Sequence, residues 1–290
     1  MGAPQENRAV ESFYAALRNL DKQEREEFRE IIKSIFKPTL RERYLTVNYH
    51  RAAFNVEMML DIKDTKQFQT LSLLARAIFE LAMEIKSIVR DRDAAKKIEL
   101  FSKVEVLKAA RQVVSFYDGR PEADLYQKQV DFVRNFGAQI DAEADGMWPP
   151  NPRTGKKQSV KHWTLTNVRQ RAKGLGAPFD RIYEVHYPHL SWMTHSGVVS
   201  PLNMTTEWVS AFVSVVYSIA IDSYVEILDT IAVEFKLSTT NEHIRRKILC
   251  NRDLGVTRTK EEGMFVLAEH GLASYFEPPE LWREAKPTTA

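Results

Sequence analysis

The segment from Gln67 to Val89 constrains the fold of this chain more than any other. Its centre reads TLSLLARAIFELAMEI, with apolar residues on almost every face of the expected helix. A helix with this pattern is buried on all sides, so other helices must surround it. A second long segment, residues 207–235, is also apolar. Its longest uncharged run, Trp208 to Ile221, is shorter than the ~20 residues that span a bilayer, so we expect a core helix and no membrane contact.

Helical periodicity extends over most of the remaining chain, and no strand pattern of convincing length occurs. We expect further helical segments at residues 5–19, 22–36, 41–62, 93–117, 121–144, 165–173, 181–195, 241–253 and 260–275. The sequence therefore predicts an all-α protein, a multi-helix bundle. A long Pro/Gly-rich basic loop around residues 145–160 interrupts the helical pattern, since residues 145–158 hold three prolines and two glycines.

The helical pattern and its breaks suggest three parts. We expect a charged N-terminal helical hairpin at residues 1–38, a helical core domain at 39–277 and a disordered tail at 278–290. Asp21 is placed to cap the second helix of the hairpin. Because the outer faces of the hairpin are charged, residues 5–36 are a candidate surface for a homodimer or another protein partner.

Composition fits a soluble protein with a large core, since 44% of residues are hydrophobic and 28% are charged. The single cysteine, Cys250, excludes a disulfide framework and a cysteine-based zinc site. No basic start followed by an apolar run occurs at the N-terminus, so we expect no export signal and a cytoplasmic location. A net charge of only +2 is not the overall footprint of a nucleic-acid binder.

The local charge is different between Gly146 and Phe179, where no acidic residue occurs. This basic tract would concentrate RNA or another phosphate-bearing ligand. A solvated face, balanced by the acidic residues just before it, is the alternative. The basic residues of the tract are Arg153, Lys156, Lys157, Lys161, Arg169, Arg171 and Lys173.

The segment that follows, residues 181–195, reads RIYEVHYPHLSWMTH and departs from an ordinary core pattern. Spacings of three and four place an aromatic and polar set on one helical face. Pro188 predicts a kink or a restart of the helix near Tyr187. The histidines of this segment do not share a face, so we expect no metal site, and no cofactor motif is present. The set on the shared face is Tyr183, Tyr187, Leu190, Ser191 and His195.

Arg76 and Glu80 form a second polar pair, in the otherwise apolar segment 67–89. They stand four residues apart and so point the same way. If they are buried, each needs a polar partner, and residues 183–195 could supply it. The alternative is an exposed salt bridge worth ~0.3 kcal/mol.

These two motifs together resemble a bacterial family of helical domains of unknown function. The motifs are Ala-Arg-x-x-x-Glu at residues 75–80 and Tyr-x-x-x-Tyr-x-x-Leu-Ser-x-x-x-His at 183–195, and the resemblance covers residues 40–235. Members are sometimes grouped with the HEPN-like helical proteins of phage defence and toxin–antitoxin systems. HEPN ribonucleases carry Arg and His separated by four to six residues, which Arg181 and His186 match, as do Arg43 and His50.

Our functional hypothesis is a metal-independent RNA-cleaving or RNA-binding protein of the toxin or defence type. Arg76 would hold phosphate oxygens, Glu80 would orient Arg76, and His195 would act as general acid or base on a ribose 2′-hydroxyl. Tyr183, Tyr187 and Ser191 would complete the catalytic cluster, the tyrosines by hydrogen bonds or by stacking on a base. Arg181 and His186 are an alternative catalytic pair. The competing hypothesis is a non-catalytic scaffold or sensor, in which the same cluster is a structural polar network.

Overall fold

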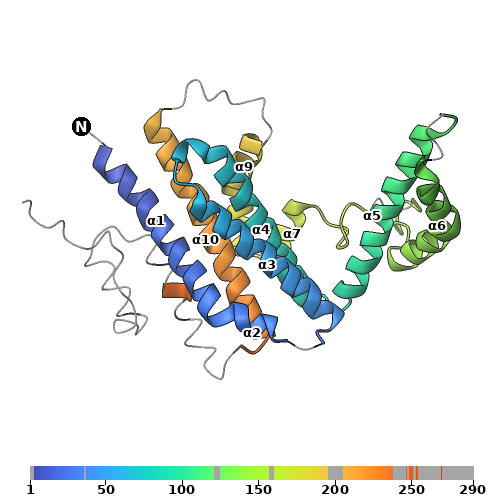
Figure 1. Ribbon diagram of the computed structural model, residues 1–290, viewed down its shortest axis with the longest axis horizontal. Helices are drawn as coiled ribbons and strands as arrows, with labels where there is room; N and C mark the ends of the chain where they lie inside the picture. The colour runs from blue at the N-terminus through green and yellow to red at the C-terminus, as the bar shows by residue number, and fades with distance from the viewer. Residues whose placement is uncertain are drawn as a thin grey trace, which may run out of the picture. The chain divides into compact units, whose positions relative to one another are not determined.

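The computed structural model describes residues 3–35, 37–120, 125–156, 160–194, 205–237, 246, 248–250, 253 and 269. Every regular element in these residues is helical, which confirms the predicted all-α fold (Figure 1). The segments expected to be helical at 241–253 and 260–275 lie outside the described residues except at isolated positions, and the expected tail at 278–290 lies wholly outside them. The long helices are α1 (Ala3–Glu24), α3 (Leu40–Asp61), α4 (Phe68–Arg90), α5 (Ala94–Tyr117), α6 (Gln127–Met147) and α10 (Thr206–Glu234). The short ones are the π-helix η1 (Arg25–Arg29), α2 (Glu30–Lys33), the 3-10 helix η2 (Thr65–Gln67), α7 (Val168–Leu175), α8 (Phe179–Val185) and α9 (Tyr187–Thr194).

The N-terminal residues form one continuous helical run from Ala3 to Lys33 in place of the expected turn at Asp21. The backbone at Glu24 is helical, with φ −57° and ψ −49°. Asp21 lies inside α1, where its Oδ2 accepts a hydrogen bond from Arg25 Nε at 3.0 Å, an i,i+4 pair. The helix continues because no Gly or Pro breaks it and because the apolar residues on both sides of Asp21 enter one core.

The chain divides into two compact units. Unit 1 comprises Met1–Val89 and Ala172–Ala290, and unit 2 comprises Arg90–Arg171. In unit 1, α10 packs against α1 and α3, as Figure 1 shows for the orange and blue helices. Phe212 of α10 also meets Phe68 of α4, with ring centroids 6.1 Å apart. Helices α1, α3, α4 and α10 therefore build the core of unit 1.

The two apolar segments singled out from sequence occupy this core. Within α4, Ile78, Phe79 and Met83 are fully buried. Among the described residues, α10 alone is long and apolar enough to cross a membrane, and 67% of its most apolar window is buried inside the protein. That burial is the pattern of a core helix.

Unit 2 is built on an antiparallel hairpin of α5 and α6. Arg111 of α5 forms a two-pronged ion pair with Asp141 of α6, with N···O distances of 3.2 and 2.6 Å. Helix α6 continues to Met147, so the first three residues of the predicted 145–160 loop are helical. The chain after α6 then turns back on the hairpin, where the Val160 carbonyl accepts a hydrogen bond from Lys108 Nζ at 2.8 Å.

Candidate functional site

Arg76 and Glu80 form an ion pair on the rim of α4. Arg76 Nε donates to Glu80 Oε1 at 2.8 Å, and the two side chains are 27% and 37% exposed. They are thus less buried than the apolar sequence around them suggested. The other faces of α4 are buried in the protein, and this ion pair lies on the strip of the helix that is partly exposed. The guanidinium is therefore a positioned cation within reach of solvent.

Tyr187 completes this cluster from a distant part of the chain. Its hydroxyl donates to Glu80 Oε1 at 2.8 Å, so one carboxylate oxygen accepts from both Arg76 and Tyr187. The Arg76 guanidinium carbon lies 5.0 Å from the centroid of the Tyr187 ring, within the range of a cation–π contact. Tyr187 itself is only 7% exposed. Arg76, Glu80 and Tyr187 are thus held together by three mutual contacts.

The environment keeps Arg76 charged and Tyr187 protonated. Burial by itself lowers the pKa of Arg76, but the hydrogen bond and charge of Glu80, together with Tyr187, outweigh it and raise that pKa. Burial is the main cause that raises the pKa of Tyr187, and the bond to Glu80 adds to it. The cluster therefore pairs one permanent cation with one carboxylate and a hydroxyl donor.

Apolar packing brings α8 and α9 against α4 at the Arg76 cluster. Phe79, the neighbour of Glu80, has its ring 6.1 Å from that of Phe179 and 5.8 Å from that of Tyr187. Phe179, Ile182 and Leu190 are buried in the same place. The restart expected near Pro188 is present, since α8 ends at Val185 and α9 begins at Tyr187.

Of the other polar residues predicted on the helical face of segment 181–195, the structure describes Tyr183 and Ser191. Tyr183 stacks on Tyr187, with centroids 4.9 Å apart and an interplanar angle of 23°. Ser191 is partly buried on α9. His195 lies outside the described residues. The structure thus brings together Arg76, Glu80, Tyr183 and Tyr187.

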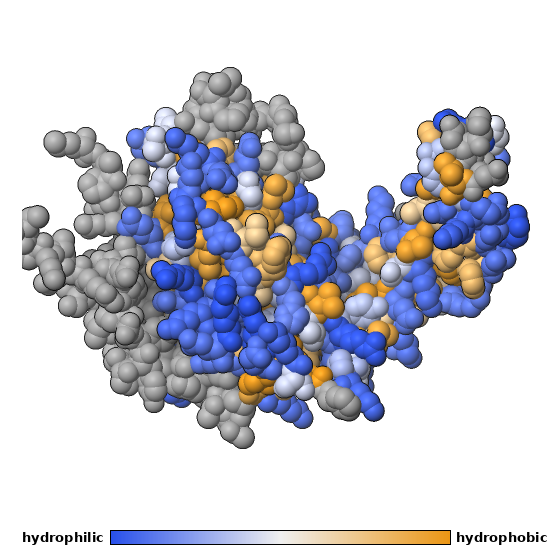
Figure 2. Space-filling model, viewed as in Figure 1, coloured by the Kyte–Doolittle hydropathy of each residue, from blue (hydrophilic) through white to orange (hydrophobic). Residues whose placement is uncertain are grey.

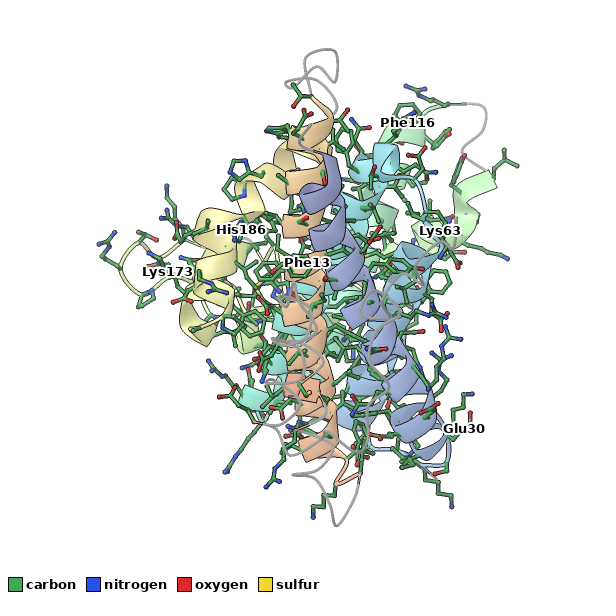
Figure 3. The ribbon with its side chains drawn as sticks, turned by 90° about the vertical axis from the view of Figure 1, so that its left-hand side faces the viewer. Phe13, Glu30, Lys63, Phe116, Lys173 and His186 are labelled. Atoms are coloured by element: carbon green, nitrogen blue, oxygen red, sulfur yellow. The ribbon has the colours of Figure 1, made fainter. Side chains whose placement is uncertain are left out.

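The alternative catalytic pair is Arg181, on α8, and His186, at the C-terminal end of α8. Arg181 is mostly exposed and reaches Asp222 Oδ2 of α10 at 3.6 Å. His186 caps the C-terminus of α8 and is half-buried. Burial, followed by the nearby charges of Arg181 and His189, lowers the pKa of His186. Figure 3 shows His186 and Lys173 on the same side of unit 1.

The basic tract divides between the two units. Arg153, Lys156, Lys161 and Arg169 are exposed in unit 2, whereas Lys157 lies outside the described residues. Lys173 belongs to unit 1 and lies 3.9 Å from Glu184. Arg171 Nη1 donates to His162 Nε2 at 2.9 Å, so it has a structural role within unit 2.

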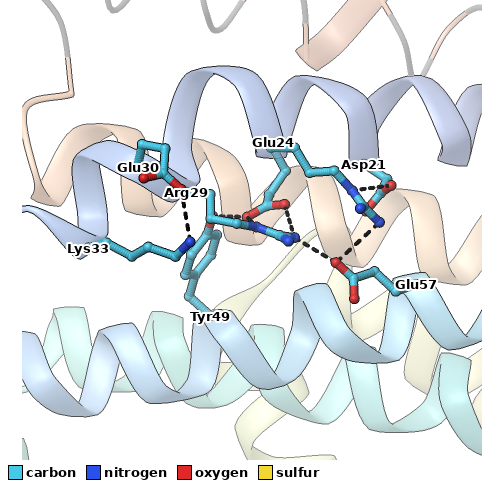
Figure 4. Close-up of polar contacts among 8 residues, drawn as sticks. Asp21, Glu24, Arg29, Glu30, Lys33, Tyr49 and Glu57 are labelled. Atoms are coloured by element: carbon cyan, nitrogen blue, oxygen red, sulfur yellow. Dashed lines mark hydrogen bonds and ion pairs between the residues drawn. The ribbon is translucent and has the colours of Figure 1, made fainter.

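A second polar cluster, between η1 and α3, has no counterpart in the sequence analysis (Figure 4). Glu24 is fully buried and accepts two hydrogen bonds from Arg29, at 3.1 and 2.5 Å, and one from the Tyr49 hydroxyl. Arg29 also reaches Glu57 Oε1 at 2.7 Å. Glu24 and Arg29 are five residues apart, a spacing that an α-helix does not bring together but the π-turn of η1 does. Arg25 also pairs with Glu57, at 3.2 Å, so each of the two carboxylates has a guanidinium partner within the protein. We therefore regard this cluster as structural.

No metal centre is found in the part of the chain that the structure describes. Among these residues, no group of three or more His, Cys, Asp or Glu side chains lies close enough to hold an ion.

The fold and the Arg76 cluster define an all-α protein with a polar contact between two segments distant in sequence. A family model described as a family of unknown function (DUF5677) matches residues 44–207, more than half of the chain and a range that includes the whole Arg76 cluster. The chain belongs to this family. No curated protein and no solved structure matches it.

Proposed function

We propose that the Arg76 cluster binds the phosphodiester of RNA and that the protein is a metal-independent endoribonuclease. The observation that carries this proposal is the Arg76 side chain, which is partly exposed and whose guanidinium is held in one place by Glu80 and the Tyr187 ring. A guanidinium suits this role because its planar fork of N–H donors matches the oxygens of a phosphate. Holding it in advance lowers the cost of ordering it when the ligand binds.

Glu80 has two opposing effects on such a site. It orients Arg76, and it also neutralises the charge that attracts a phosphate. Glu80 Oε1 accepts from both Arg76 and Tyr187, which fixes the pair at one edge, and a ligand would meet Arg76 where its side chain is exposed. We therefore assign Glu80 and Tyr187 as positioning residues, and Arg76 as the residue that contacts the phosphate.

The reaction proposed at this site is an intramolecular transfer within RNA. The ribose 2′-oxygen attacks the adjacent phosphorus, the bond to the 5′-oxygen of the next nucleotide breaks, and a 2′,3′-cyclic phosphate and a 5′-hydroxyl result. A general base takes the 2′-hydroxyl proton and a general acid returns one to the leaving oxygen. We assign the removal of the 2′-hydroxyl proton to His195, with His186 as the alternative, and water supplies the proton that the leaving oxygen takes up. Arg76 would stabilise the negative charge that develops on the nonbridging oxygens.

Two further features favour RNA as the ligand. Tyr183 is partly exposed and stacks on the buried Tyr187, and an exposed tyrosine ring is the kind of surface that accepts an unpaired base. The exposed residues of the basic tract supply the charge that a polyanion needs. With the sequence resemblance, they support a cytoplasmic toxin or phage-defence factor of the HEPN-like type.

A second candidate function is favoured by the low exposure of Tyr187. Its hydrogen bond to Glu80 links α9 to α4 across 107 residues of sequence, and such a link can fix the register of two helices. In this case the protein is a scaffold or sensor, and the Arg76 cluster has no substrate.

The test is cleavage of a mixed RNA pool by the purified full chain, with and without a metal chelator. The proposal expects cleavage that survives the chelator and leaves 2′,3′-cyclic phosphate ends. Arg76→Ala and His195→Ala should each reduce the rate by ~10²-fold or more while the far-ultraviolet circular dichroism stays unchanged. Lys86→Ala is the matched control, because Lys86 forms another partly exposed ion pair from α4, with Glu226 at 2.8 Å.

Three results would contradict the ribonuclease proposal. Absence of cleavage would refute the ribonuclease activity. Cleavage that the chelator abolishes would indicate a metal-dependent reaction. If His195→Ala instead costs ~1–3 kcal/mol of stability and changes no activity, the scaffold function is the better account.

A further inference from the structure

Helix α3 carries a second apolar face that unit 1 does not bury. Its inner face is in the core, through Leu45, Tyr49 and Val56. On the outer face, Phe54 is 60% exposed and Val47 is 54% exposed. Figure 2 shows apolar surface over the region where Figure 1 draws α3. The outer stripe consists of Leu40, Tyr44, Val47, Arg51, Phe54 and Met58.

The spacing of this stripe is that of a helix that pairs with another helix. Its members follow one another at intervals of four, three, four, three and four residues. This is the heptad pattern of a two-helix seam, whose average repeat is 3.5 residues. Isolated exposed apolar residues need no explanation, but a continuous seam along a whole helix indicates a partner.

The charges beside the stripe favour a second copy of this chain, in antiparallel orientation. Arg43 is exposed near the N-terminal end of α3, and Asp61 is exposed at its C-terminal end. Antiparallel pairing of two α3 helices brings each basic end to the acidic end of the partner. Parallel pairing would place like charges together.

One register places the whole stripe in matching pairs. When Leu40 faces the partner's Met58, Tyr44 faces the partner's Phe54 and Val47 faces the partner's Arg51. The same three contacts recur on the other side of the twofold axis, as a symmetric dimer requires. Arg51 can lay its aliphatic stem on the partner's Val47 and keep its guanidinium in water. A single polar residue in a seam also disfavours shifted registers.

We infer that this protein forms a homodimer through an antiparallel pair of α3 helices. The 22 residues of α3 make a helix ~33 Å long, so the interface is at the small end of specific interfaces and the dimer should be weak, with a dissociation constant in the micromolar range. This interface is different from residues 5–36, and it does not depend on the proposed ribonuclease activity.

The first test is sedimentation equilibrium of the full chain, from about 1 to 200 μM, a range that brackets micromolar dissociation constants. We expect the wild type to pass from monomer to dimer. Phe54→Glu should weaken the association at least tenfold. Val233→Glu, which introduces the same charge at an equally apolar and exposed position on α10, should not. A monomer at every concentration, or an equal effect of both variants, overturns the inference.

The second test determines the orientation. Leu40→Cys with Met58→Cys should give a covalent dimer on mild oxidation, because these positions face each other across the antiparallel pair. Leu40→Cys alone should remain non-covalent, whereas parallel pairing would link it to its own copy. The native Cys250 is buried and present in every variant. A covalent dimer of the single variant, or none of the double variant, overturns the antiparallel pairing.

Discussion

Tyr187 donates a hydrogen bond to Glu80 across 107 residues of sequence, and the same carboxylate oxygen accepts from Arg76. This contact ties α9 to α4 and is the basis of the proposed site. It has consequences for stability that do not depend on any substrate.

Tyr187→Phe should lower the free energy of unfolding by ~0.5–1.5 kcal/mol, because it removes the hydroxyl and leaves the ring in place. Tyr183→Phe is the matched control, since it removes a hydroxyl from the stacked neighbour that makes no bond to Glu80. Urea unfolding monitored by circular dichroism measures both. Equal effects of the two variants would show that the Glu80 bond is not what Tyr187 contributes.

Glu24→Ala should be among the most destabilising single changes in the chain. It leaves Arg29 and Tyr49 without their buried acceptor, and breaking such a network costs ~3–5 kcal/mol. Glu30→Ala, on the exposed side of the same helical run, removes only a surface pair with Lys33 and should leave the unfolding midpoint unchanged. Similar midpoints for the two variants would contradict the burial of Glu24.

Stability should fall as the pH drops below neutrality, in part through His50. Burial lowers the pKa of His50 from its ordinary value of 6.5, and the charge of Glu24 only partly offsets this. The unfolded chain therefore takes up the proton first, so the contribution is present above pH 6.5 and is lost as the pH falls through the lower folded pKa. We expect His50→Asn to reduce the difference in unfolding free energy between pH 8 and pH 5. An unchanged difference would exclude His50 as a cause.

Gly137→Ala should stabilise the α5–α6 hairpin. Gly137 is inside α6, and an added methyl group would meet Arg111 at 3.4 Å and Leu107 at 3.5 Å, which is ordinary contact. Alanine in a helix interior is favoured over glycine by ~0.5–1 kcal/mol. A higher melting temperature is expected, and a lower one would mean that α5 and α6 cannot accommodate the methyl group.

If the protein binds RNA as proposed, Lys156→Ala with Lys161→Ala should weaken binding and make it less sensitive to salt. Each lost phosphate contact on a single strand reduces the slope of log affinity against log salt by about 0.7, so the pair should reduce it by about 1.4. Fluorescence anisotropy with a labelled oligonucleotide at several salt concentrations measures this slope. An unchanged slope would exclude these two lysines from the contact.

The sequence identified the helices because their signals are local. Apolar residues on almost every face of segment 67–89 predicted a core helix, and α4 is one, apart from the exposed strip that holds Arg76 and Glu80. Pro188 indicated the break between α8 and α9. The pairing of Arg76 with Glu80 also follows from their spacing of four residues, which is fixed by the geometry of an α-helix.

Only the tertiary structure decided what these helices meet and how far they are covered. That Tyr187 reaches Glu80 depends on the packing of Phe79 against Phe179, which is not a local property. The sequence did not predict the Glu24–Arg29 pair, because side chains five residues apart come together only where the helix forms a π-turn. The outer face of α3 is apolar in sequence, but its exposure depends on which face α1 and α10 cover, since burial is a property of the assembled helices.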